Sequence, residues 1–155
     1  MTFLLKSFTL FSSLFIFSQS IAQSNTEDDH DFSKVNLFLD IGAHAIAQAS
    51  FNFEGKILSG KKITLYGRAG FGLAQAWGDS KLTGGITGLT MLTGKKNNHI
   101  EIGGGAFLGF YSNSEFRPLP HFDLGYRYQK SNGGFIFRAK VGILGLGIGL
   151  GYAFK

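Results

Sequence analysis

The last forty residues of the chain alternate between large apolar residues and small, polar or charged ones. Three runs keep this period of two, HFDLGYRYQ, FIFRAKVGI and LGIGLGYAFK, and short connections separate them. Because successive side chains of a β-strand point to opposite faces, a period of two indicates strands with two unlike faces. One predicted face carries Asp123, Arg127, Arg138, Lys140 and several glycines, and the other carries Phe, Leu, Ile, Val and Tyr. The pattern therefore predicts a β-sheet with charge on one side and apolar surface on the other.

The same alternation continues upstream and predicts eight strands in all. Their expected ranges are 35–44, 47–54, 63–76, 83–93, 98–111, 119–129, 134–143 and 145–154. Between them, the segments 55–62, 94–98, 112–118 and 131–134 have the glycine-rich or polar composition of turns and loops. Strand 83–93 is the least regular, since threonines fall on both of its predicted faces.

The predicted polar faces together hold as many acids as bases. The set consists of Asp40, Glu54, Arg68, Glu101, Asp123, Arg127, Arg138 and Lys140. A narrow polar interior needs such a balance, because an unpaired buried charge is costly. The same faces are rich in glycine, and small residues leave room there for large charged side chains. The apolar faces would then point outwards, with Trp77, Phe154 and several tyrosines near strand ends as an aromatic girdle.

We therefore expect an all-β fold, an eight-stranded antiparallel up-and-down transmembrane β-barrel. Each membrane strand needs about 9–11 residues, and the chain is long enough to supply eight. Closure leaves no unpaired sheet edge, as hydrocarbon requires of the backbone. An inverted alternative is a soluble periplasmic or secreted barrel of the lipocalin kind. In that alternative the Phe- and Leu-rich faces would point inwards onto an apolar ligand.

The N-terminal segment has the features of a secretory signal peptide. Lys6 supplies a positive start, residues 8–17 form a short apolar core, and Ser20 and Ala22 are small residues at the cleavage positions. The expected division is a signal peptide over residues 1–22, an acidic leader over 23–34 and a barrel domain over 35–155. Within the leader, the acidic tract 27–31 is expected to form a solvated lead-in to the first strand. The chain has no cysteine, which excludes disulfides, thiol nucleophiles and cysteine metal ligands. Its basic residues are spread along the chain rather than clustered, so no nucleic-acid partner is expected.

The stretches GYRYQ, GGFIFR and GIGLGYAF resemble the C-terminal half of small outer-membrane β-barrel proteins of Gram-negative bacteria. These are mostly uncharacterised barrels of the OmpX/OmpA-transmembrane type, and HIEIGGGAF resembles their preceding strand. The resemblance implies insertion by the barrel-assembly machinery and a location in the outer membrane. Proteins of this group commonly end in an aromatic residue, whereas here Lys155 follows Phe154.

Two kinds of lipid-modifying outer-membrane enzyme also use eight-stranded barrels. A lipid A deacylase would need His, Ser and an acid together on the membrane-facing surface near the rim. His121 and Asp123 with Ser112 or Ser114 could supply these groups. A palmitoyltransferase-like barrel would need a His with an Asp–Ser pair, and Asp79–Ser80 is such a pair, although its context, WGDSK, is that of a turn. The histidines are too scattered for a metal site. We expect no catalytic residues, no cofactor and no metal, and not an enzyme.

The function class expected from the sequence is a structural or interaction protein of the outer membrane, with a polar lumen plugged by side chains. Its expected partners are outer-membrane lipid or lipopolysaccharide and, during insertion, the assembly machinery. We expect a monomer with both termini in the periplasm. A lipid A-modifying outer-membrane enzyme and the soluble lipocalin-like barrel are the alternatives.

Overall fold

The computed structural model describes residues 32–43, 46–60, 62–76, 81–94, 96–111, 115–143 and 145–155. The expected signal peptide and residues 23–31 of the expected leader lie outside the described residues, as do His44 and Trp77. No helix in this described part is long and apolar enough to cross a membrane.

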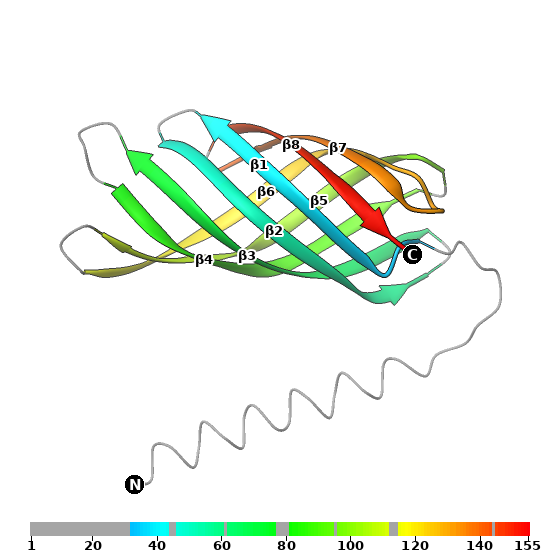
Figure 1. Cartoon of the computed structure of the whole chain (residues 1–155), viewed down its shortest axis with the longest axis horizontal. Helices are drawn as coiled ribbons and strands as arrows, with labels where there is room; N and C mark the ends of the chain where they lie inside the picture. The colour runs from blue at the N-terminus through cyan, green and yellow to red at the C-terminus, as the bar shows by residue number, and fades with distance from the viewer. Residues whose placement is uncertain are drawn as a thin grey trace, which may run out of the picture.

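Eight antiparallel strands form a closed barrel (Figure 1). They are β1 (Val35–Ala43), β2 (Ile46–Ser59), β3 (Ile63–Ala76), β4 (Lys81–Thr93), β5 (Asn98–Tyr111), β6 (Phe116–Gln129), β7 (Gly134–Gly142) and β8 (Gly145–Phe154). Each strand pairs with the next along the chain, and β8 closes on β1 with Phe154 opposite Val35. The fold expected from the alternation, an all-β barrel of eight antiparallel strands, is confirmed.

The register of the pairs fixes the width of the barrel. From Gln129 on β6, one can move to its partner on the next strand, then to that residue's partner, and so on once around the barrel. This path leads back to Leu119 on the same strand, ten positions earlier. Strands staggered in this way are tilted, and eight of them enclose an interior just wide enough for side chains. Whatever lies on the inner face must therefore fill the lumen.

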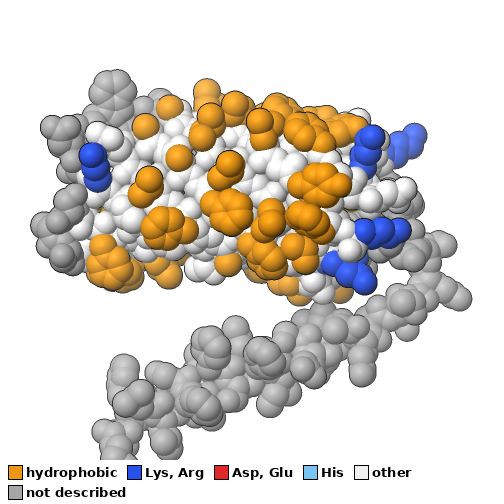
Figure 2. Space-filling model, viewed as in Figure 1, with side chains coloured by type: hydrophobic (Ala, Val, Ile, Leu, Met, Phe, Trp, Pro, Cys, Tyr) orange, Lys and Arg blue, Asp and Glu red, His pale blue; other side chains and the backbone are white. Residues whose placement is uncertain are grey.

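The outer wall is apolar. Leu39, Phe71 and Leu150 are each more than half exposed, and Figure 2 shows apolar side chains over the whole visible wall with no acidic side chain among them. Among the described strand residues, the outward positions carry one charged side chain, Lys81 at the rim. A barrel surrounded by water would reverse these faces, whereas a barrel surrounded by lipid has this distribution. The orientation required by the lipocalin-like alternative is not the one observed.

Two expected turns are partly strand. The segment after Glu54 continues β2 as far as Ser59, because a bulge between Lys56 and Leu58 shifts the register and keeps the strand paired with β3. β6 begins at Phe116 rather than at 119, so the last three residues of the polar connection expected over 112–118 are strand.

The prolines fit into β6 because they lie on its unpaired edge. Pairing of β6 with β7 begins at Asp123, so residues 116–121 meet β5 on one side and no β7 residue on the other. The carbonyl of Phe122 accepts from the Ile143 N–H at 3.1 Å, so the even-numbered residues of β6 turn their backbone groups towards β7. Pro118 and Pro120 occupy such positions and have no N–H to leave unpaired.

Candidate functional site: the closed polar lumen

The structure brings all eight of the expected charged residues into one lumen. Asp40 comes from β1, Glu54 from β2, Arg68 from β3, Glu101 from β5, Asp123 and Arg127 from β6, and Arg138 and Lys140 from β7. β8 contributes small residues instead. A Cβ added at its Gly149 would overlap the carboxylate of Asp40, so the absence of a side chain there makes room for an ion pair.

Arg127 is the centre of the half of the lumen nearest the chain termini. Its Nη1 and Nη2 donate to the two carboxylate oxygens of Glu54 at 2.7 and 3.0 Å, and its Nε donates to Glu101 Oε2 at 2.6 Å. The side chains of Arg127 and Glu54 are completely buried. Bidentate contacts between arginine and a carboxylate fix the relative orientation of the two side chains and also neutralise their charges.

Arg138 connects this half of the lumen with the next layer. Its Nε donates to Glu101 Oε2 at 3.0 Å and its Nη2 donates to Glu101 Oε1. Its Nη1 donates to both oxygens of Asp40, at 3.1 and 3.0 Å. One guanidinium therefore joins acids from β1 and β5 across the lumen.

Asp40 receives three cations. Besides Arg138, the Nη2 of Arg68 donates to its Oδ2 at 2.8 Å and the Nζ of Lys140 at 2.9 Å. Asp123 shares the last two partners at longer range, since Arg68 Nη1 and Lys140 Nζ each lie 3.5 Å from its Oδ2. All eight charges are thus in ion-pair contact with an opposite charge.

An aromatic ring lies among the guanidiniums. The ring of Phe38 is buried, and the guanidinium carbons of Arg138, Arg68 and Arg127 lie 4.0, 5.3 and 5.6 Å from its centroid. These distances are those of cation–π contacts. Phe38 and the ion pairs together fill the cross-section of the lumen, so a wide channel cannot pass through it.

The last residues of the leader close the terminus end of the lumen. Ser33 is fully buried, where its hydroxyl donates to Asn36 and accepts from Gln129, and its carbonyl accepts from Tyr66. Phe32 is buried edge-on against the ring of His99, with 5.1 Å between the ring centroids. Hydrogen bonds and ring contacts therefore hold these two residues of the expected leader inside the barrel, whereas the acidic tract 27–31, which is expected to be solvated, lies outside the described residues.

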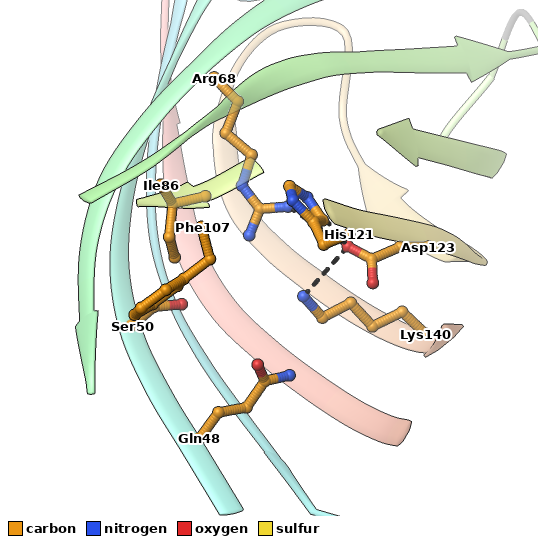
Figure 3. Close-up of a pocket in the computed structure, with 8 residues that line it drawn as sticks. All are labelled: Gln48, Ser50, Arg68, Ile86, Phe107, His121, Asp123 and Lys140. Carbon is orange, nitrogen blue, oxygen red and sulfur yellow. Dashed lines mark hydrogen bonds and ion pairs between the residues drawn. The ribbon is translucent and has the colours of Figure 1, made fainter. Parts of the chain in front are cut away.

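Towards the other end, the polar lining encloses a small cavity of about 20 Å³ (Figure 3). Its lining residues are Gln48, Ser50, Arg68, Ile86, Phe107, His121, Asp123 and Lys140. Arg68 Nη1 and His121 Nδ1 are buried there, and neither has a hydrogen-bond partner within the described residues. The volume suits one water-sized species, for which these nitrogens offer polar contacts.

Of the candidate residues for lipid A chemistry, His121 and Asp123 face the lumen. His121 Nε2 lies 3.7 Å from Asp123 Oδ2, but both side chains are buried inside the barrel rather than on its membrane-facing surface. Ser112, Ser114 and Asp79–Ser80 lie outside the described residues. Within the described part of the chain, no group of three or more histidine or acidic side chains is placed to hold a metal ion.

The sequence pattern did not predict that several uncharged lumen residues belong to the ion-pair network. Asn36, Asn52 and Gln129 hydrogen-bond directly to the ion pairs, and alternation places them on the inward face. Phe32 and Ser33 precede the first strand, and no periodic signal in the sequence places them inside the barrel.

Comparisons with known proteins add a fold-level similarity. No family model matches the chain, and no curated protein matches it. A solved structure described as "De novo design of transmembrane beta-barrels" is similar over 84% of this chain and 99% of that chain, with a TM-score of 0.49 and 11% sequence identity.

Proposed function

We propose that this protein is an integral outer-membrane β-barrel with a structural or interaction role and a polar lumen plugged by its own side chains. It is not an enzyme in this proposal, and it binds no cofactor. The lumen residues Asp40, Glu54, Arg68, Glu101, Asp123, Arg127, Arg138 and Lys140 hold the wall together from within and bind no substrate.

The distribution of side chains between the two faces carries this proposal. Charges are paired inside a closed barrel, while Leu, Ile and Phe side chains cover the outside. Burying ion pairs and exposing apolar surface both cost free energy in water. In a bilayer the apolar wall is solvated by lipid, and only the closed ladder of backbone hydrogen bonds is tolerated there.

Export and orientation complete the proposal. Residues 1–22 act as a Sec-type signal peptide, the assembly machinery inserts the barrel, and it remains a monomer with both termini in the periplasm. The opposite loops then face outwards, where lipopolysaccharide is the expected neighbour. An even number of strands, eight, puts both ends of the barrel domain at the same rim, and the proposal assigns this rim to the periplasm.

Gel mobility of the protein in carbonate-washed outer membranes tests the proposal. We expect an unboiled sample to migrate fast as a compact barrel and a boiled sample of the same membranes to migrate more slowly. Release of the protein into the carbonate supernatant, without a mobility shift, would contradict a membrane location.

A further inference from the structure

We propose that the terminus end of the barrel carries a binding surface for anionic phospholipid headgroups, formed by a ring of lysines. This inference rests on the proposed function, because it requires the barrel to lie in a bilayer. It adds a lipid class and a leaflet to that proposal.

The ring consists of Lys34, Lys62, Lys96 and Lys130, which we call the lysine collar, and all four side chains are exposed. Lys34 precedes β1, and the other three lie in the β2–β3, β4–β5 and β6–β7 connections. Successive connections at this end are two strands apart, or about 10 Å along the circumference. Figure 2 shows basic side chains gathered at this end of the visible face.

No acidic side chain of the described residues balances the collar. Four of the five described acids, Asp40, Glu54, Glu101 and Asp123, are buried in the lumen, and Glu115 lies at the loop end. Among the described side chains, the collar therefore presents positive charge around the rim that no acidic side chain offsets. Juxtamembrane lysines in this arrangement attract anionic lipid, an effect that decays within a Debye length.

Outward tyrosines place the collar at headgroup level. Tyr126, Tyr128 and Tyr152 all lie in the terminus-proximal part of their strands, and the hydroxyl of Tyr126 donates to Asn98 at 2.7 Å. Tyrosine marks the boundary between hydrocarbon and water in membrane proteins. The connections that carry the lysines lie just beyond this boundary, where lipid phosphates are found.

Spin-labelled lipids test the inference directly. The protein is reconstituted into phosphatidylcholine vesicles that contain spin-labelled phosphatidylglycerol or phosphatidylcholine, and the motionally restricted fraction of each label is measured. We expect phosphatidylglycerol to be preferred by about fivefold, the attraction of roughly one lysine. At about 1 M salt the Debye length is near 3 Å, so the preference should largely disappear.

Matched variants locate the effect. Lys62→Gln with Lys130→Gln should weaken the preference, and Gln at all four collar positions should abolish it. The control is Lys81→Gln with Arg117→Gln, which removes two exposed charges at the opposite end and should leave the preference unchanged. Equal loss in the control, or no preference in the unchanged protein, would overturn the inference.

The competing occupant is the chain's own acidic tract, Glu27-Asp28-Asp29-His30-Asp31. A preference that appears only after its four acids are changed to Gln or Asn would show that this tract covers the collar, and would overturn lipid binding. Flotation with the vesicles and the heat-dependent mobility shift are checked first. Failure to insert would contradict the proposed function, whereas insertion without lipid preference would contradict only the collar.

Discussion

Arg127 illustrates how single side chains stabilise this barrel. Its guanidinium contacts Glu54 and Glu101, which come from strands on different sides of the lumen. Removing Arg127 would leave Glu54 charged, desolvated and without its ion-pair partner, and would leave Glu101 with Arg138 alone. Such a loss costs more than the pair itself contributes. The lumen ion pairs therefore connect distant strands, and breaking one of them should lower the free energy of unfolding.

Arg127→Met is expected to lower the free energy of unfolding by about 3–5 kcal/mol, and Arg127→Glu by more, because the latter adds a third carboxylate to the cluster. Denaturant titration of the gel-mobility shift in lipid vesicles measures both. Lys81→Glu reverses an exposed charge and should change stability by no more than about 0.5 kcal/mol. Equal stability of all three variants would show that the lumen network is not stabilising.

Among the strands, β6 is unusual because part of it has only one neighbour. Its residues 116–121 extend beyond the end of the β7–β8 hairpin, and a free strand edge is a template for pairing with another chain. Pro118 and Pro120 remove two N–H donors from that edge. The prolines thus disfavour edge-to-edge pairing with a second molecule along the part of β6 that has no described β7 neighbour.

Replacing both Pro118 and Pro120 with valine is expected to produce dimers or larger species, because the restored N–H groups can pair edge to edge. Chemical cross-linking and sedimentation in detergent measure this. Leu108→Val is the control, since this residue lies opposite Pro118 on β5, a strand paired on both sides. If the variant with both prolines replaced is as monomeric as the control, the prolines do not prevent association.

The polarity of the whole molecule is the reverse of that of a soluble barrel, since its interior is polar and its outer face is apolar. The charges sit on the axis and the apolar side chains surround it. This predicts a penalty for outward charge that depends on depth in the bilayer.

Leu39→Arg places a charge on the outer wall, well within β1, and should destabilise the barrel in vesicles by about 2–4 kcal/mol. Gln75→Arg places the same charge on the outer face at the loop end of β3, where the expected cost is about 0–1 kcal/mol. Unfolding in denaturant measures the two. A tolerated Leu39→Arg would indicate an aqueous outer surface and contradict the membrane proposal.

Much of this architecture follows from alternation alone. Period two assigns a face to each residue, because successive strand side chains point oppositely whatever the tertiary structure. It identified eight strands, the outward apolar wall and the eight inward charges. It failed at Gly55 and at Pro118, where local composition indicates a turn but cross-strand pairing keeps the chain extended.

Only the tertiary structure decided which charges meet. The residues that pair across the lumen, such as Asp40 with Arg138, are far apart in sequence, and their proximity depends on the stagger and closure of the barrel. The same closure brings Phe32 and Ser33 under the strands and gathers lysines from separate turns into one ring. The local sequence determines whether a side chain points inwards or outwards. Which residue it contacts across the lumen depends on how the eight tilted strands close into a barrel.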